Sequence, residues 1–322
     1  MTKKRTSLLV LVAALAVFAS IAPAQSYPTK PIRMVVAQAA GGPTDVVTRI
    51  FSSKLSELLG QQIVVDNRPG AGGSVAGEVV AHAPADGYTL CVMANGTAAV
   101  APHFIKLNYS VEKDFAPVAL IGNSPLALMV STAMPTHSVK ELISLAKERP
   151  GTINFGSSGQ GSTGQLAGEL FKIMAAVELT HVPYKGAAPA LVALVTGEIQ
   201  MLVSAFSSSL TYIKQGRVRA LAVTGTKRQR VFPDLPTVAE TLPGYEATSW
   251  YALLTRAGTP RAIIERLNRE ATRALTDPDM RWKLVGAGVD VEILTPEALG
   301  AKIRADYERW GKVVKATGMK AQ

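Results

Sequence analysis

Residues 31–59 read PIRMVVAQAAGGPTDVVTRIFSSKLSELL, and this stretch decides the class of fold. The apolar run at 31–37 predicts a buried strand, and the GGPTD sequence at 41–45 predicts a turn that ends it. From residue 46 to 59 the apolar residues recur at helical spacing, which predicts a helix. The unit is therefore a strand, a glycine turn and a helix, which is the building block of α/β proteins.

Strands and helices continue to alternate along the rest of the chain. We predict strands at 63–66, 88–94, 152–155, 180–184, 199–203, 218–223 and from about 250, and helices at 74–83, 138–149, 163–176, 187–196, 260–275, 278–285 and 296–314. This alternation favours an α/β fold with mixed, mostly parallel sheets that helices cover on both faces.

The length of the chain favours two lobes. A single core rarely grows beyond about 250 to 300 residues, and this chain has 322. The pattern breaks near 118–123 and again near 243–248. We therefore predict a first lobe made from residues 25–120 and 248–322 and a second lobe made from residues 121–247.

The first 24 residues have the features of a cleavable signal peptide. Lys3, Lys4 and Arg5 precede an uncharged run at 8–21, and small residues follow at 22–24. A retained membrane anchor is the alternative, but a span needs about 20 apolar residues and the run has roughly 14. We therefore expect export to the periplasm, with no lipid anchor.

Composition excludes several classes of protein. The single cysteine, Cys91, excludes an intrachain disulfide, and the four histidines are too widely spaced to form a local metal site. The net charge of +10 suits an anionic partner, but the aromatic content of 6% is low for a protein that stacks on nucleic-acid bases. We expect a small anionic ligand, no nucleic acid, no metal and no cofactor.

Glycine-rich and hydroxyl-rich loops follow several of the predicted strands. Glycines expose backbone N–H groups, hydroxyls add donors, and a helix that starts there adds positive potential, so such loops suit a small anion. In open α/β sheets, ligands bind where the strands deliver their carboxyl ends. The candidate residues are Gly41, Gly42, Pro43, Thr44 and Asp45; Asn95, Gly96 and Thr97; Ser157, Ser158, Gly159, Gly161, Ser162 and Thr163; and Tyr184, Lys185, Gly186 and Ala187.

Some of these residues have a second interpretation. The 159–164 loop could be only a connecting turn, and Lys185 could be a solvated charge instead of part of a positive field. A carboxylate at Asp45 would repel an anionic ligand, so we expect it to bond to the amides of its own helix.

Two enzyme hypotheses compete with ligand capture. The GQGSTG sequence at 159–164 matches a dinucleotide fingerprint, but the next strand is followed by Lys185 and Gly186 instead of an acidic residue. Ser74 lies in an incomplete nucleophile elbow, and we interpret it as the cap of the following helix. A dehydrogenase or a hydrolase is therefore the less favoured alternative.

Six blocks stand in the order found in one known family. They are AAGGPTD at 39–45, VDNRPGAGG at 65–73, DGYTL at 86–90, KDFAPV at 113–118, GSSG at 156–159 and VPYKG at 182–186. In these blocks the chain resembles the Bug-type receptors of tripartite tricarboxylate transporters.

The resemblance implies a two-lobe class II periplasmic binding-protein fold with a hinge and an interlobe cleft. It further implies a receptor, not an enzyme, that captures a small organic carboxylate and delivers it to a membrane permease. A receptor that signals to a sensor kinase is the alternative. We expect a monomer that closes around its ligand.

The chain departs from the family at two positions that the resemblance places in the cleft. Ser204 stands where many relatives carry an Asp, and Ala98 follows Thr97 where a His is common. Ser204, which we include among the ligand-binding residues, has no charge to pair with an ammonium group. This favours a ligand without an amino group.

Overall fold

The structure is a computed structural model that describes residues 27–70, 73–229 and 232–317. The predicted signal peptide at 1–24 lies outside these described residues. In the part of the chain that is described, no helix has the length and apolar character needed to cross a bilayer.

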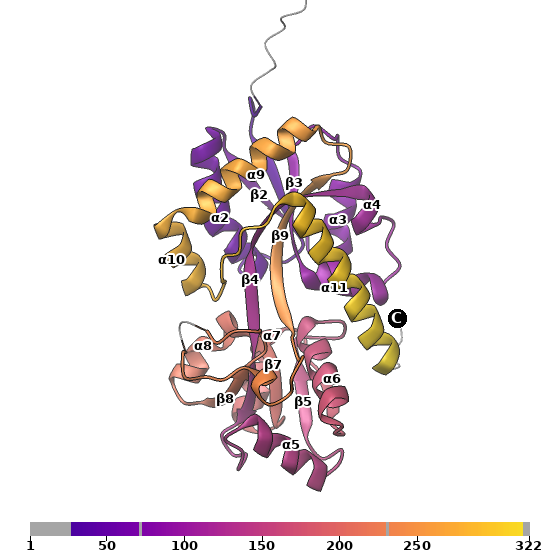
Figure 1. The fold of residues 1–322 in the computed structure, drawn as a ribbon, viewed down its shortest axis with the longest axis vertical. Helices are drawn as coiled ribbons and strands as arrows, with labels where there is room; N and C mark the ends of the chain where they lie inside the picture. Colours follow the sequence, from indigo (N-terminus) through magenta and orange to yellow (C-terminus); the bar gives the residue numbers. More distant parts are fainter. Residues whose placement is uncertain (1–26, 71–72, 230–231, 318–322) are drawn as a thin grey trace, which may run out of the picture.

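Two lobes are stacked along the long axis and are joined by two long strands, β4 and β9 (Figure 1). The strands are β1 Ile32–Val36, β2 Ile63–Asn67, β3 Thr89–Ala94, β4 Phe115–Ser131, β5 Asn154–Ser157, β6 Thr180–Pro183, β7 Met201–Ala205, β8 Val218–Val223 and β9 Thr248–Arg256. Lobe 1 contains β1, β2 and β3, and lobe 2 contains β5, β6, β7 and β8.

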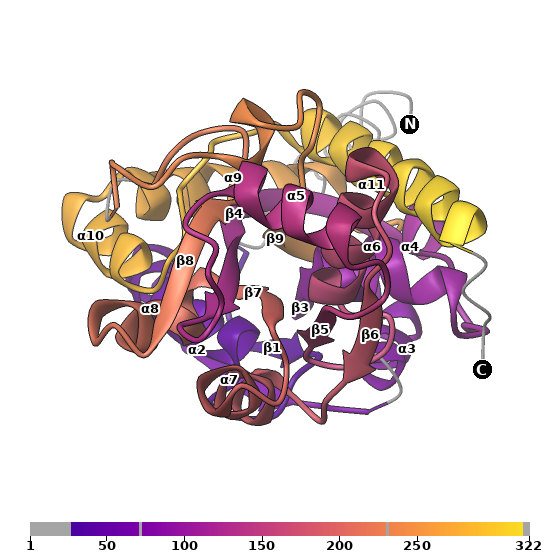
Figure 2. The ribbon, with the colours of Figure 1, turned by 90° about the horizontal axis from the view of Figure 1, so that it is seen from below.

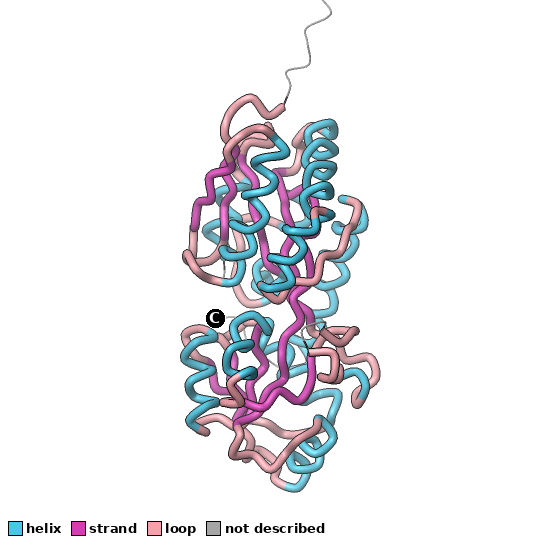
Figure 3. The backbone as a smooth tube through the Cα atoms, turned by 90° about the vertical axis from the view of Figure 1, so that its left-hand side faces the viewer, coloured by secondary structure: helices cyan, strands magenta, loops and turns pink. Residues whose placement is uncertain are grey.

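Helices cover the strands of each lobe (Figure 3). They are α2 Pro43–Leu59, α3 Ser74–Ala81, α4 Val111–Asp114, α5 Val139–Glu148, α6 Thr163–Ala175, α7 Ala187–Thr196, α8 Phe206–Lys214, α9 Arg261–Thr276, α10 Pro278–Gly286 and α11 Pro296–Thr317. Short helical turns lie at Gly96–Val100, Ala101–His103 and Val238–Glu240. Figure 2 places α11 and α7 on opposite sides of β4 and β9.

The strand order is β2-β1-β3-β9-β4-β7-β5-β6, with β8 paired to β4. The parallel pairs join β1 to β2 and β3, and β5 to β6 and β7. The antiparallel pairs each involve β4 or β9. The predicted α/β class with mixed sheets is therefore confirmed, and the parallel part of each lobe is the part that carries the glycine loops.

The sequence did not predict β4 as one strand. The break predicted near 118–123 lies inside this strand, which shifts register against β9 next to Pro117 and Gly122. Two further expectations were wrong. Ser74 is the first residue of α3, whose cap is Gly73, and the loop expected at 95–97 is the start of a helical segment.

The junction between the lobes lies within β4. Its residues up to Pro125 pair with β9, and from Leu126 onward they pair with β7 and β8. The buried hydroxyl of Thr224 accepts the N–H of Leu126 at 2.8 Å and lies 2.6 Å from the carbonyl oxygen of Ala247. One side chain thus ties together three segments where the chain crosses between lobes.

The central strands β1, β3 and β9 are buried on both faces. In β1, Met34 packs into a core under α2, α9 and α10, whereas Val35 packs into a core under α3 and α11. The second of these cores continues into lobe 2 through α6, and the hydroxyl of Tyr245 donates to the carbonyl oxygen of Ala167 in α6 at 2.9 Å. The C-terminal helix α11 also contacts α6, so the lobes share a packed side.

Candidate functional site

Loops from the two lobes meet at the carboxyl ends of the parallel strands. Thr163 Oγ1, at the start of α6 in lobe 2, lies 3.3 Å from Asn95 Oδ1, which follows β3 in lobe 1. The same Asn95 oxygen accepts the hydroxyl of Ser249 at 2.9 Å, and Asn95 Nδ2 donates to the carbonyl oxygen of Thr248 at 3.1 Å. Asn95 is fully buried, and its hydrogen bonds connect lobe 1, β9 and lobe 2.

Two glycines also show how closely the two lobes approach each other here. A Cβ placed on Gly96 would lie 3.6 Å from Thr163 Oγ1, and one placed on Gly161 would lie 3.4 Å from the Phe104 ring. Thr97 packs against Gly73 instead of facing the opposite loop, since a Cβ on that glycine would lie 2.6 Å from its side chain.

The carboxylate of Asp45 is bonded to one amide of the preceding loop and to two side chains, where we expected the amides of its own helix. It accepts the N–H of Gly41 at 2.9 Å, Arg49 Nε at 2.9 Å and Asn67 Nδ2 at 2.9 Å. Burial raises the pKa of Asp45, but the hydrogen bonds from Arg49, Gly41 and Asn67 and the charge of Arg49 outweigh it, so the pKa is lowered. Its charge is therefore balanced by Arg49, and Asn67 is a structural residue that the site prediction missed.

Most amides of the first glycine loop are also engaged. The N–H of Gly42 donates to the carbonyl oxygen of Ala39 at 3.1 Å, and the N–H of Thr44 donates to Gln38 Oε1 at 3.0 Å. Pro43 is the first residue of α2 and has no N–H. The hydroxyl of Thr44 is buried and has no hydrogen-bond partner among the described residues. Thr44 is thus the side chain of this loop with unused hydrogen-bonding capacity.

The second glycine loop offers backbone donors. Ser162 caps α6 by accepting the N–H of Gln165 at 3.3 Å. The N–H groups of Ser158, Thr163 and Gly164 have no acceptor among the described residues. Because these groups lie at or next to the N-terminus of a 13-residue helix, they form a site of positive potential.

Three side chains lie within and beneath this loop. Ser157 Oγ lies 2.8 Å from His181 Nε2 and 2.9 Å from the carbonyl oxygen of Gly159, and Gln165 Nε2 lies 3.2 Å from His181 Nδ1. Burial, and then the charge of Lys172, lower the pKa of His181 to about 4. Sequence reasoning predicted Ser157 but missed both His181 and Gln165.

The remaining predicted residues lie around the same edge. Tyr184 donates its backbone N–H to the carbonyl oxygen of Ser157 at 3.1 Å and its hydroxyl to Glu198 at 2.7 Å. Lys185 is exposed and has no ion pair in the described part of the chain. Gly186, with φ of 123°, precedes α7, of which Ala187 is the first residue. Ser204 is 6% exposed, and its hydroxyl lies 3.5 Å from that of Ser208.

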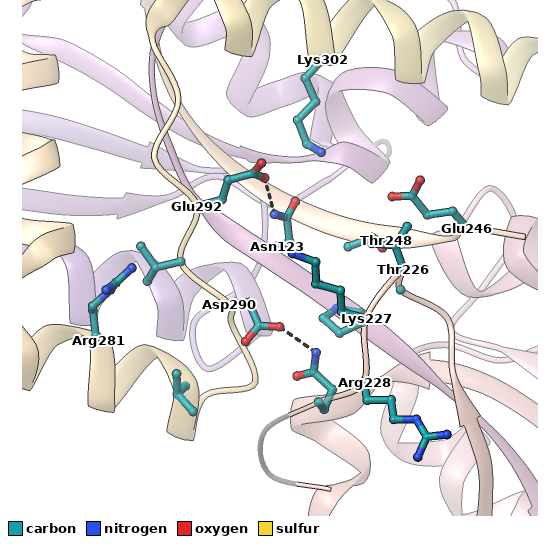
Figure 4. A pocket seen from close by; sticks show the side chains of 15 residues that line it. Asn123, Thr226, Lys227, Arg228, Glu246, Thr248, Arg281, Asp290, Glu292 and Lys302 are labelled. Atoms are coloured by element: carbon teal, nitrogen blue, oxygen red, sulfur yellow. Dashed lines mark hydrogen bonds between the residues drawn. The ribbon is translucent and has the colours of Figure 1, made fainter. Parts of the chain in front are cut away.

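A pocket of about 510 Å³ lies elsewhere, at the outer edge of β4 (Figure 4). Asn123 pairs with Trp250 of β9 on one side and with Asp290 on the other, so the pocket lies on the side of β4 away from the glycine loops. Gln229 donates to Asp290 at 2.7 Å across it, and Asn123 donates to Glu292 at 2.6 Å. None of the predicted ligand-binding residues lines it.

Comparisons with known proteins agree on one family. Residues 47–319 match the family model for the tripartite tricarboxylate transporter family receptor. BugT of Bordetella pertussis is 35% identical over 304 residues, which is 92% of each chain.

Two solved structures have similar folds. An R. palustris protein determined with adipate has 37% identity and a TM-score of 0.83, covering 92% of this chain and 100% of that one. MatC of Rhodopseudomonas palustris with bound malate has 34% identity and a TM-score of 0.76, covering 89% and 100%.

Proposed function

The chain belongs to the tripartite tricarboxylate transporter receptor family, and on that premise we propose that it captures a small organic carboxylate between its two lobes. Proteins of this family and fold are periplasmic solute-binding receptors, not enzymes. Similar structures hold adipate and malate, which makes a dicarboxylate the ligand class to test first.

One observation carries the proposal. The contact between Thr163 and Asn95 brings the start of α6 to lobe 1, and the N–H groups of Thr163 and Gly164 are left without acceptors in the described chain. A carboxylate at this position would gain charge-assisted bonds from lobe 2 while it touches lobe 1. The ligand would therefore favour the closed state, which is the condition for a ligand to drive closure.

A few such hydrogen bonds supply enough free energy to shift the receptor from its open to its closed state. Moving a two-state equilibrium from 1:99 to 99:1 needs about 5.5 kcal/mol of differential affinity. A hydrogen bond to a charged group contributes about 1.5 to 3 kcal/mol, so two to four N–H donors that reach the ligand in the closed state supply this amount. No arginine clamp is required.

We propose lobe boundaries at 25–120 and 248–322 for lobe 1 and 121–247 for lobe 2. The closed receptor would act as a monomer and dock on a membrane permease, after export directed by residues 1–24. A pull-down of membrane proteins with and without ligand tests this partner against a sensor kinase.

A thermal-shift screen of adipate, malate and amino-dicarboxylates tests the function directly. At a ligand concentration of 100 times Kd, binding adds about 2.7 kcal/mol of stability, which raises Tm by about 5 to 10 °C for lobes of this size. We expect a response to the simple carboxylates and none to aspartate or glutamate, because Ser204 supplies no charge for an ammonium group. No response to any carboxylate would contradict the proposal.

A further inference from the structure

His181 lies in the middle of a linear series of hydrogen bonds under the second glycine loop. The series runs from the N–H of Gly161 to Gln165 Oε1 at 2.7 Å, and from Gln165 Nε2 to His181 Nδ1 at 3.2 Å. It continues from His181 Nε2 to Ser157 Oγ at 2.8 Å and ends at the carbonyl oxygen of Gly159 at 2.9 Å. Both ends of the series are therefore backbone groups of the loop itself.

The direction of every proton in this series follows from its first member. The N–H of Gly161 can only donate, so Gln165 must present its oxygen to it and its NH₂ group to His181. His181 Nδ1 then has to accept, which places the ring proton on Nε2. That proton is donated to Ser157, whose own hydroxyl proton is left for the carbonyl oxygen of Gly159.

The loop needs such support because its backbone is unusual. Gly159 and Gly161 have φ angles of 136° and 70°, which are conformations that glycine alone adopts readily. With their polar groups bonded inward to Ser157 and Gln165, the N–H groups of Ser158 and Thr163 remain without acceptors in the described structure. This series of hydrogen bonds thus uses one set of donors to support the loop and leaves another set, the N–H groups of Ser158 and Thr163, for a ligand.

The surroundings of His181 favour its neutral form. The ring packs on Phe155, with centroids 4.9 Å apart, and the flanking groups Ser157 and Gln165 carry no charge. The charge of Lys172 in α6 acts on the ring, and Lys172 itself forms an ion pair with Glu169 at 2.9 Å. A protonated ring would turn an N–H toward the NH₂ group of Gln165, so that two donors would meet.

We propose that His181 is the positioning residue of the second ligand loop, and that as a neutral imidazole it holds Ser157 and Gln165 in the arrangement that aims the free N–H groups at a carboxylate. This inference rests on the proposed function for the identity of the loop's ligand. Its structural part, the tautomer and its coupling to the loop, can be tested without any ligand.

The first experiment is NMR of the ligand-free protein with ¹⁵N-labelled histidine and glycine. We expect the Nε2–H tautomer at pH 7, and we expect the amide resonances of Gly159 and Gly161 to move with the same midpoint as His181 on acidification. In Gln165→Glu a carboxylate faces Nδ1, so the midpoint should rise by more than about one pH unit. The resonances of His82, His103 and His137 are the internal reference.

The second experiment measures adipate affinity at pH 7. His181→Ala should weaken binding by about tenfold, because it removes two hydrogen bonds from the loop. His181→Gln, whose amide can reach Ser157, should restore affinity to within about threefold of the parent. Circular dichroism checks that both variants are folded.

The outcomes separate this inference from the proposed function. If no carboxylate of the thermal-shift screen binds the parent protein, the proposed function fails, while the NMR result still decides the hydrogen-bonded series around His181. An Nδ1–H tautomer, or a Gln165→Glu variant with an unchanged His181 midpoint, would overturn the inference. Equal affinity of the parent, His181→Ala and His181→Gln would overturn it as well.

Discussion

Replacing Gly164 by alanine should move the start of α6 away from β7. A Cβ on Gly164 would lie 2.3 Å from the carbonyl oxygen of Val203, whereas ordinary contact begins near 3.4 Å. The backbone of β7 is held in the sheet by β4 and β5, so the helix has to shift by about 1 Å. Overpacking of this kind costs about 1 to 3 kcal/mol of unfolding free energy.

Urea denaturation of the ligand-free protein measures this cost. The matched control is Gly286→Ala at the end of α10, where no atom lies within 4 Å of the new Cβ and the change should be neutral or add up to about 1 kcal/mol of stability. Because the shift displaces the N–H groups of Thr163 and Gly164, Gly164→Ala should also weaken adipate binding by about tenfold or more. A Gly164→Ala protein as stable as Gly286→Ala, and with parental affinity, would refute the reasoning.

Three further predictions concern the hinge, the cleft and pH. Thr224→Val leaves the N–H of Leu126 without its acceptor at the crossing between lobes, so the free energy of unfolding, measured by urea denaturation, should fall by about 1 to 3 kcal/mol. The control is Thr180→Val at an exposed position, which should lower it by less than about 0.5 kcal/mol. Thr163→Val removes the contact with Asn95, and calorimetry should show adipate affinity lowered about two- to tenfold; unchanged affinity would argue against closure at this contact. His181 has its pKa lowered from 6.5 to about 4, so the unfolded chain binds a proton between these pH values that the native protein does not. As the pH falls from 6.5 to 4, the free energy of unfolding of the parent should decrease by about 1 to 2 kcal/mol more than that of His181→Gln. This difference is smaller than the full linkage value because solvent reaches the half-buried ring. Parallel curves of stability against pH would contradict the prediction.

The sequence predicted the elements of this fold where local patterns are strong. The GGPTD sequence marks the start of α2, although the helix begins at Pro43, inside the turn predicted at 41–45, and alternating apolar strands and helices mark both parallel halves. It failed at β4, because Pro117, Gly122 and Pro125 are residue types that disfavour the interior of a strand. The long pairing with β9 overrides that local signal, and such a pairing is a property of the tertiary structure.

The candidate site was predicted in outline but not in its internal bonding. Glycine and hydroxyl spacing identified the loops, and the contact between Thr163 and Asn95 shows that two of them face each other. The same spacing could not show that Asp45 accepts the N–H of Gly41, or that Ser157 is hydrogen-bonded to His181. Gln165 did leave a signal, since a Gln three residues after a capping Ser is typical of a helix start.

The most direct test of carboxylate capture is a crystal structure of the protein grown with adipate. We predict a carboxylate oxygen within about 3.2 Å of the N–H groups of Thr163 or Gly164, with the other end of the ligand in contact with lobe 1. Adipate bound instead in the pocket at the outer edge of β4, or at the surface of a single lobe, would contradict the account.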